Sequence, residues 1–330
     1  MNTRYLGRLC VAMLSVWSIS WMHPAVAAWQ PTGPITIVVP SGPGGGNDRT
    51  ARILAHLLQE EKLVSNPIVV VNKTGAGGVI AQNFLNAHEG DGTYVMLSNP
   101  TLLTNPIMGV GAAQYTDVTP LAQLFTEYVM TVARTQSPVK SGKQVLHDLK
   151  QDPDTYTIGV ALGLGGAVHI SIALVAKAAG IAPTKLRMVP YLAAGDAMAA
   201  MLGGHVDLLV TTPANVSAQL QAGLARGLAI SAPKGLSGSL AQVPTWKEEG
   251  ADVVFGNWRG LVGPAGMTSE QVDYWESTIK KLVDSAAWKK EVAAEQGEPM
   301  YMDHVQSAKF LAEDNVRLTE ILKELGLAKQ

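Results

Sequence analysis

Short loops rich in glycine, serine, threonine and asparagine carry the residue types that could do chemistry in this sequence. The first, at residues 41–48, places four glycines between Ser41 and Asn47, and similar loops follow at residues 72–78 and 98–101. Glycine leaves the backbone N–H groups uncovered, and a helix that begins at such a loop adds the positive end of its dipole. The loops therefore predict a binding site for an anion.

The common catalytic and nucleotide-binding motifs do not occur. The glycine loops match neither G-x-x-x-x-G-K-[ST] nor G-x-G-x-x-G, and the sequence has no G-x-S-x-G elbow and no H-E-x-x-H pair. Its histidines are scattered and show no metal-ligand spacing. We therefore expect a binding protein with no cofactor and no metal site. An enzyme assembled from distant residues stays open as an alternative.

Each loop needs a strand before it and a helix after it to hold it in place. Residues 35–39 form a short apolar run, which predicts a buried strand. After the loop, residues 51–58 carry one apolar helical stripe, and Asn47 or Asp48 is expected to cap that helix. The repeating unit is thus a strand, a glycine loop and a helix.

This unit recurs along the chain in two sets. Strands are expected at residues 35–39, 67–71 and 94–97 in the first set, and at 157–160, 186–190, 205–210 and 228–231 in the second. The alternation predicts an α/β protein with two similar domains, each a mostly parallel sheet flanked by helices. In such sheets ligands bind outside the carboxyl ends of the strands.

The C-terminal part follows a different pattern. It has one strand at residues 258–262, a helix opened by a capping box at 268–271, and a last helix capped by Asp303. These elements bring no new glycine loop, so we expect them to pack on the first domain. The predicted division is residues 1–27 as a signal peptide, 28–130 with 256–330 as a discontinuous domain 1, and 131–255 as domain 2, with the ligand cleft between the domains.

The N-terminus has the features of a secretory signal. Arg4 and Arg8 precede or begin an apolar run that reaches residue 22, and a small-x-small site ends at Ala27. Cleavage there would remove Cys10, the only cysteine, and would change the formal net charge from −2 to −4 through the loss of two arginines. Such a chain offers no thiol chemistry and no basic surface for nucleic acid. We expect a periplasmic protein of a Gram-negative bacterium; an uncleaved membrane anchor is the alternative.

Some residues outside the loops have ordinary structural interpretations. Trp258 is expected in the core and Arg259 in a surface ion pair. Arg49 and Arg52 are typical of solvated helix residues, and His169 is typical of a structural histidine on a helix.

A series of motifs runs through the chain in a fixed order. They are P-S-G-P-G-G-G at 40–46 with Asp48, V-N-K-T-G-A-G-G at 71–78, D-G-T-Y at 91–94, His169, V-P-Y at 189–191, L-G-G-H-V-D at 202–207, V-P-T at 243–245 with E-G at 249–250, and W-R-G at 258–260. Together they resemble the substrate-binding receptors of tripartite tricarboxylate transporters, the Bug family. The resemblance covers residues 35–329.

This resemblance implies a periplasmic binding protein of type II, a two-domain Venus-flytrap that closes on a small organic carboxylate. A citrate-like tricarboxylate or a dicarboxylate is implied as the ligand, and a membrane permease of one large and one small subunit as the partner. We expect a monomer and no nucleic-acid partner. A sensor module for a membrane kinase would bind the same ligand and stays open as an alternative.

The resemblance also implies which residues surround the ligand. In the first domain they are Ser41, Gly42, Gly44, Gly45, Gly46, Asn47, Asp48, Gly75, Ala76, Gly77, Gly78, Ser98, Asn99 and Thr101, and in the second domain Gly163, Leu164, Gly165, Gly166, His169, Tyr191, Ala193, Ala194, Gly195, Thr211 and Thr212. The sequence departs from the commoner family pattern at residues 161–164 and 191–195. Both departures lie on the wall expected to contact the distal end of the ligand.

Overall fold

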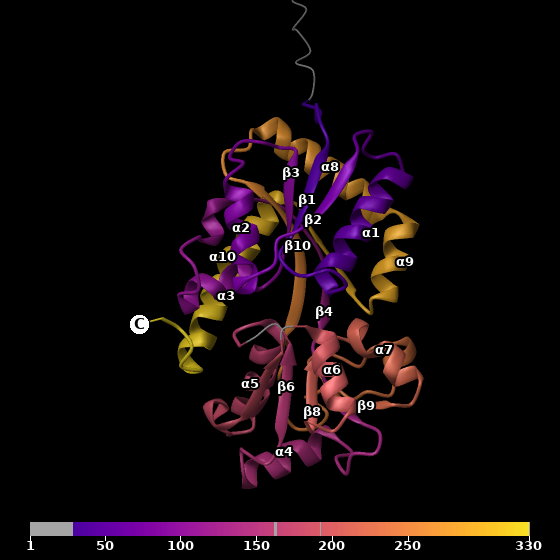
Figure 1. The fold of residues 1–330 in the computed structure, drawn as a ribbon, viewed down its shortest axis with the longest axis vertical. Coiled ribbons are helices and arrows are strands. Elements are labelled where there is room, and N and C mark those ends of the chain that lie inside the picture. The colour runs from indigo at the N-terminus through magenta and orange to yellow at the C-terminus, as the bar shows by residue number, and fades with distance from the viewer. Residues whose placement is uncertain (1–28, 162–163, 192, 330) are drawn as a thin grey trace, which may run out of the picture.

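The computed structural model describes residues 29–161, 164–191 and 193–329, which form two lobes with one sheet each (Figure 1). Residues 1–27, the expected signal peptide, lie outside the described residues. Within the described part of the chain, no helix is both long enough and apolar enough to cross a bilayer.

The first lobe is built on a six-stranded mixed sheet. Its strands are β1 (Ile35–Val39), β2 (Ile68–Asn72), β3 (Tyr94–Ser98), β4 (Val118–Tyr128), β10 (Gly256–Pro264) and β11 (Glu298–Met302). Their order across the sheet is β11–β4–β10–β3–β1–β2. β1 pairs in parallel with β2 and β3, whereas β10 is antiparallel to β3 and β4, and β11 is antiparallel to β4.

Helices cover both faces of this sheet. They are α1 (Gly46–Glu60), α2 (Val79–Asn86), α3 (Thr101–Met108), α8 (Ser269–Asp284), α9 (Ala286–Ala294) and α10 (His304–Glu324). Ile35, Ile37 and Val39 pack in one cluster with α1, α8 and α9, and Val38 packs in another with α2, α3 and α10. Because side chains alternate along a strand, a strand covered on both faces needs an unbroken apolar run.

The second lobe contains a five-stranded mixed sheet. Its strands are β5 (Met130–Arg134), β6 (Thr157–Ala161), β7 (Arg187–Tyr191), β8 (Leu208–Thr211) and β9 (Ala225–Ile230), and its helices are α4 (Gly142–Gln151), α5 (Ala167–Ala178), α6 (Ala194–Leu202) and α7 (Pro213–Gln221). The strand order is β7–β6–β8–β5–β9. β6 is parallel to β7 and β8, and β5 is antiparallel to β8 and β9. In the described parts of the two lobes, single 3₁₀ turns occur at Ala76–Gly78, Tyr115–Asp117, Pro183–Lys185 and Gly238–Leu240.

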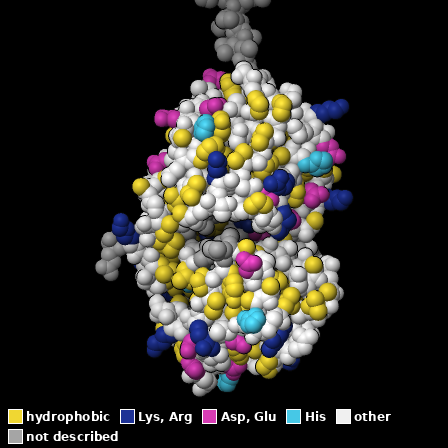
Figure 2. All heavy atoms as spheres, viewed as in Figure 1, with side chains coloured by type: hydrophobic (Ala, Val, Ile, Leu, Met, Phe, Trp, Pro, Cys, Tyr) yellow, Lys and Arg dark blue, Asp and Glu magenta, His cyan; other side chains and the backbone are white. Residues whose placement is uncertain are grey.

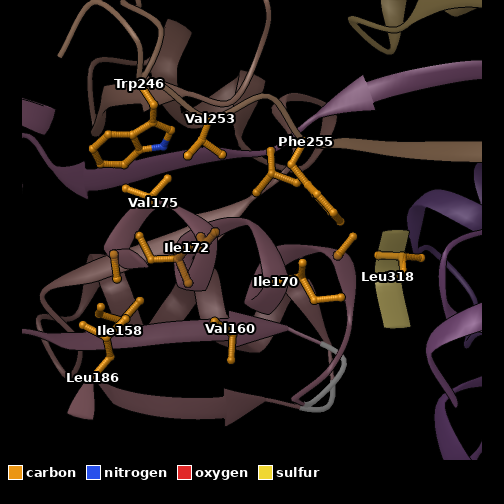
Figure 3. Close-up of a cluster of buried hydrophobic side chains, with 14 of the residues drawn as sticks. Ile158, Val160, Ile170, Ile172, Val175, Leu186, Trp246, Val253, Phe255 and Leu318 are labelled. Atoms are coloured by element: carbon orange, nitrogen blue, oxygen red, sulfur yellow. The ribbon is translucent and has the colours of Figure 1, made fainter. Parts of the chain in front are cut away.

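One part of the core of the second lobe lies between its sheet and α5, and a second cluster packs strand residues against α6 and α7. Figure 3 shows Val160 of β6 below Ile170 and Ile172 of α5, with Trp246 on the opposite side of that helix. Trp246 is only 1 % exposed, although it lies in a segment without regular structure. The segment between β9 and β10 therefore forms part of the core and fixes the approach of the chain to the first lobe.

Two crossings of the chain join the lobes. β4 ends at Tyr128 and β5 begins at Met130, so Val129 is the first crossing; the second passes through Phe255 into β10. The fully buried Ser231 joins them. Its Oγ accepts a hydrogen bond from Val129 N at 3.1 Å and lies 2.9 Å from the carbonyl oxygen of Val129 and 2.8 Å from that of Phe255.

The expected α/β class is confirmed, and the structure corrects two details. Both sheets are mixed, because β4, β10 and β11 in the first lobe and β5 and β9 in the second run antiparallel to a neighbour. The helix after the first glycine loop is capped by neither Asn47 nor Asp48: Gly45 is its N-cap residue, and Asp48 lies in its first turn.

Candidate ligand-binding cleft

Six helices begin at the loops that follow parallel strands of the two sheets. These helices are α1, α2 and α3 in the first lobe and α5, α6 and α7 in the second; within the described residues, none of their N-cap residues makes a side-chain capping hydrogen bond. At α3 the neighbouring Asn99 takes this role, because its Oδ1 accepts from Thr101 N at 2.8 Å. By contrast, α4, α8, α9 and α10 are capped by the side chains of Ser141, Thr268, Ser285 and Asp303. First-turn N–H groups that no cap satisfies can bind an anion instead.

Asp48 holds the first glycine loop in shape. Its carboxylate accepts hydrogen bonds from Gly44 N at 2.8 Å, Asn72 Nδ2 at 2.9 Å and Arg52 Nε at 3.0 Å. Asn72 Nδ2 also donates to the carbonyl oxygen of Ser41 at 2.9 Å. Burial alone would raise the pKa of Asp48, but the hydrogen bonds from Arg52, Gly44 and Asn72 outweigh it and lower the pKa. The carboxylate is thus engaged within the protein.

The second loop needs glycine for its backbone. Gly75, Gly77 and Gly78 have φ angles of 132°, 63° and 109°, which side chains strongly disfavour. The Asn105 side chain donates to Gly77 O at 3.1 Å, and a Cβ on Gly77 would lie 2.9 Å from Asn105 Oδ1. This loop therefore lies directly against α3, the helix that follows the third loop.

The second and third loops of the first lobe meet around a small pocket. It has about 240 Å³ of empty space, which includes open solvent, and is lined by residues of these two loops, among them Gly78, Ser98 and Thr101, and by Pro40, which precedes the first loop. Two buried hydroxyl oxygens, Ser41 Oγ and Ser98 Oγ, have no hydrogen-bond partner among the described residues. Buried polar atoms are normally satisfied, so these hydroxyls suit a ligand or an ordered water.

A buried ion pair lies behind the first glycine loop. Glu127 and Arg259 form it with side chains only 3 % and 6 % exposed, and Asn257 Nδ2 donates to Glu127 Oε1 at 3.1 Å. Arg259 Nη2 lies 3.1 Å from the position that a Cβ on Gly46 would take. The expectation of a surface pair for Arg259 is therefore wrong, because β10 is a central strand of the sheet. Trp258 is in the core as expected.

His169 supports the first loop of the second lobe. Its Nδ1 accepts a hydrogen bond from Gly165 N at 2.8 Å, and burial lowers the pKa of His169 to about 4. A neutral imidazole whose Nδ1 accepts must carry its proton on Nε2. Gly165 has a φ angle of 84°, and a Cβ there would collide with the side chain of Met108 in the first lobe, so the two lobes touch at this point.

The other expected residues of the second lobe lie at the starts of α6 and α7. Ala193 and Thr212 are the N-cap residues of these helices, and Gly195 is exposed in the first turn of α6. Thr211 and Thr212 are buried, Leu164 is exposed, and Tyr191 is half-buried at the end of β7. Gly163 lies outside the described residues.

The expected residues that the structure describes thus form two groups, one at the loops and helix starts of each lobe. Figure 2 shows that the surface is hollowed where the two lobes meet. Among the described residues, no group of three or more His, Cys, Asp or Glu side chains could hold a metal ion.

One contact across the junction was not predicted from the sequence. Arg49 of α1 donates to Asn215 Oδ1 of α7 and forms an ion pair with Glu295 at 3.1 Å. Arg49 was expected to be solvated, but its side chain is only 30 % exposed. No local pattern could reveal the contact, because Asn215 and Glu295 lie 166 and 246 residues from Arg49 in the chain.

Comparisons with known proteins identify the family. The profile described as "Tripartite tricarboxylate transporter family receptor" matches residues 50–327. A Cupriavidus necator protein, named only by its position in the gbd 5′ region, is 29 % identical over 91 % of this chain and 89 % of its own.

Solved structures agree with this match. The periplasmic binding protein BugD is 25 % identical with a TM-score of 0.81, covering 91 % of this chain and 100 % of its own. A Rhodopseudomonas palustris protein solved with adipate is 24 % identical with a TM-score of 0.82, covering 90 % and 99 % of the two chains, and shares the fold. The periplasmic-binding-protein fold expected from the sequence is confirmed. With most of its length matched by the family profile, the chain belongs to the receptors of the tripartite tricarboxylate transporter family, the Bug family.

Proposed function

We propose that this protein is a periplasmic receptor that captures a small organic carboxylate between its lobes and delivers it to a membrane permease of one large and one small subunit. The cleft would lie between domain 1, residues 28–130 with 256–330, and domain 2, residues 131–255. Membership of a receptor family supports the class of function. The ligand we propose is a dicarboxylate or a citrate-like tricarboxylate.

The observation that carries this proposal is the set of uncapped helices on both sides of the junction. Two lie in the first lobe, α1 and α2, and three in the second, α5, α6 and α7. Each N-terminus contributes about 0.3–1 kcal/mol to binding an anion, and more where water is excluded. Charge-assisted hydrogen bonds from the N–H groups add to this. Uncapped N-termini in both lobes suit a ligand with a carboxylate at each end, and the Rhodopseudomonas palustris structure makes adipate a suitable first probe.

The proposed roles of the site residues follow from their contacts. The unpartnered hydroxyls of Ser41 and Ser98 would bind the ligand or a bridging water. The N–H groups beside Gly45 would bind a carboxylate directly. Asp48 would act on the loop and not on the ligand, because its oxygens already accept hydrogen bonds from the protein.

Ligand binding can be tested on purified residues 28–330 by thermal shift and calorimetry. The panel is adipate, malate, citrate and glutamate, with glucose 6-phosphate and AMP as other anions. A ligand at 100 times its dissociation constant adds about 2.7 kcal/mol of stability, which raises the melting temperature by several degrees. We expect a carboxylate to do so with one-to-one stoichiometry and without turnover. Binding of a phosphate compound but no carboxylate would contradict the proposal.

Two glycine substitutions test the position of the site. A Cβ on Gly45 would meet only ordinary contacts, the nearest at 3.5 Å, and one on Gly195 would meet no atom within 4 Å. Gly45→Val and Gly195→Val should therefore fold, yet weaken the binding of that carboxylate by more than tenfold by holding it away from the backbone. Gly235→Val, on an exposed and open loop residue, is the matched control. Unchanged affinity in both cleft variants would place the site elsewhere.

Transport requires a separate experiment. Deleting the gene should abolish uptake of the identified carboxylate, and a Gly45→Val copy should fail to restore it. If uptake continues and only a transcriptional response is lost, the protein is a sensor and not a transport receptor.

A further inference from the structure

Arg49 contacts three segments that are distant in sequence. Its Nη1 donates to Gly44 O at 3.1 Å, and its Nη1 and Nη2 each lie 3.3 Å from Asn215 Oδ1. Its Nε and Nη2 donate to the carboxylate of Glu295 at 3.1–3.3 Å. One guanidinium therefore joins the first glycine loop, α9 and, across the junction, α7.

The two sides of this contact belong to different lobes. Arg49 and Glu295 lie on α1 and next to α9 in the first lobe, and Asn215 lies in the first turn of α7 in the second. Figure 1 shows α7 below α1 and α9, on the side of the molecule opposite α5 and α3. The contact thus bridges the mouth of the junction on one side.

The ion pair with Glu295 directs Arg49 toward Asn215 and away from a carboxylate ligand. A lone arginine at the cleft mouth would attract a carboxylate ligand directly, but the charge of Arg49 is paired with Glu295, whose side chain is 18 % exposed. The pair orients the guanidinium so that its remaining donors face Gly44 and Asn215. Asn215 is itself oriented, since its Nδ2 donates to Thr212 Oγ1 at 3.2 Å. A planar guanidinium with five donors is suited to such a three-way contact, and a lysine is not.

We propose, on the basis of the receptor function above, that Arg49 is a positioning residue that latches the lobes together through Asn215. Glu295 keeps the guanidinium of Arg49 oriented toward Asn215. The hydrogen bond to Gly44 O connects Arg49 to the loop that receives the ligand. Opening of the cleft breaks the Arg49–Asn215 contact, while the Arg49–Glu295 contact stays within the first lobe. The latch thereby sets how far the protein is closed before a ligand arrives.

Lobe separation can be measured without any ligand. A chain beginning at Ala28 contains no cysteine, so spin labels attach only to introduced ones. Lys290→Cys on α9 and Ala218→Cys on α7 are exposed residues on the two sides of the latch. Double electron–electron resonance on this pair reports the distribution of distances across the mouth.

Breaking the latch should shift the population toward longer distances. We expect Arg49→Gln and Asn215→Ala each to lower the ratio of closed to open protein by three- to tenfold, and the double variant to do no more than either alone. Asn215→Asp should have the opposite effect, because it keeps an acceptor and adds a charge opposite Arg49. Arg187→Gln, which removes the same charge at an exposed residue paired with Asp154 within its own lobe, is the control.

Two outcomes would contradict the proposed latch. If Arg49→Gln opens the protein and Asn215→Ala does not, Arg49 acts only within the first lobe. If Asn215→Asp opens the protein as Asn215→Ala does, the acceptor role of Asn215 is wrong. Because the sample holds no ligand, failure of the carboxylate screen would leave these results unchanged, so the latch and the receptor function fail independently.

Discussion

At the scale of single residues, His169 makes the stability of the folded protein depend on pH. Burial holds the pKa of His169 at about 4, against an ordinary value of 6.5. In the unfolded chain the imidazole regains its ordinary pKa and binds a proton that the folded state rejects. The contribution of His169 to stability is therefore complete above about pH 6.5 and is lost as the pH falls toward 4. Below about pH 4 His169 is protonated in both the folded and the unfolded state, so it lowers the stability no further.

Replacing His169 should remove this loss. Between pH 7.5 and 4.5 the free energy of unfolding of the wild type should fall by about 2–3 kcal/mol more than that of His169→Gln, by the linkage between pKa and stability. Glutamine keeps an acceptor for the N–H of Gly165. Urea denaturation at the two pH values measures the difference, and His147→Gln on the exposed face of α4 controls for the loss of a histidine. Parallel curves for His169→Gln and the wild type would contradict the prediction.

The roles of some single residues could not be predicted from the sequence. The sequence places Asp48 in a glycine loop, where a carboxylate can either contact a ligand or hold the loop. Only the structure brings Asn72 and Arg52 to its oxygens and so separates the two roles. Arg259 is similar: its burial depends on β10 lying inside the sheet, and no local pattern states that position.

At the scale of elements, the helices differ in how their N-termini are satisfied. α4, α8, α9 and α10 carry their own caps, whereas α1, α2, α5, α6 and α7 do not. A cap typically stabilises a helix by about 1 kcal/mol, so the uncapped helices give up stability at the positions where a ligand is proposed to bind.

Cap substitutions should separate stability from binding. Ser141→Ala removes the hydroxyl that accepts from Gln144 N at 3.1 Å on α4, and should cost about 1 kcal/mol of stability with no change in carboxylate affinity. Gly45→Ser should do the reverse: the new hydroxyl caps α1, preserves or raises stability by a few tenths of a kcal/mol, and weakens binding. Denaturation and calorimetry on both variants check this. Weaker binding in Ser141→Ala, or unchanged binding in Gly45→Ser, would argue against ligand contact at the α1 N-terminus.

The elements were predictable where local pattern and fold agree. The apolar run of β1 matches its predicted bounds, 35–39, because a doubly covered strand needs an unbroken apolar sequence. β4 was not predicted, since it buries Gln123, Thr126 and Glu127 and so lacks a clear apolar pattern. These polar residues are accommodated by β10, which arrives from the far end of the chain. Long-range pairing of this kind is not encoded in any local window.

At the scale of the whole molecule, Ser231 ties the two crossings into one unit. Its hydroxyl contacts the backbone of both Val129 and Phe255, and its own backbone bonds to both as well: Ser231 N donates to Val129 O at 2.8 Å, and Phe255 N donates to Ser231 O at 2.9 Å. In a two-lobed protein that closes by hinge motion, the crossings absorb the change of φ and ψ. Ser231 therefore connects the two crossings directly to each other.

Removing the hydroxyl should loosen one crossing selectively. In Ser231→Ala the amide of Val129 loses its acceptor, and its hydrogen exchange should accelerate three- to tenfold, as expected for the loss of one buried hydrogen bond. The amide of Phe255 keeps its backbone acceptor and should change less. Ser137→Ala, which removes an acceptor from Val139 N at 3.2 Å within the second lobe, serves as the control. Equal acceleration of Val129 and Phe255 would mean that the hydroxyl does not distinguish the crossings.

The central place of β10 in the first sheet sets the order in which a growing chain can fold. The second sheet uses strands that are consecutive along the chain, β5 to β9, and can assemble as soon as they leave the ribosome. β3 and β4, however, have no common neighbour until residues 256–264 are made. The first sheet therefore closes only near the end of synthesis. The second lobe can thus be complete while the first still lacks its central strand.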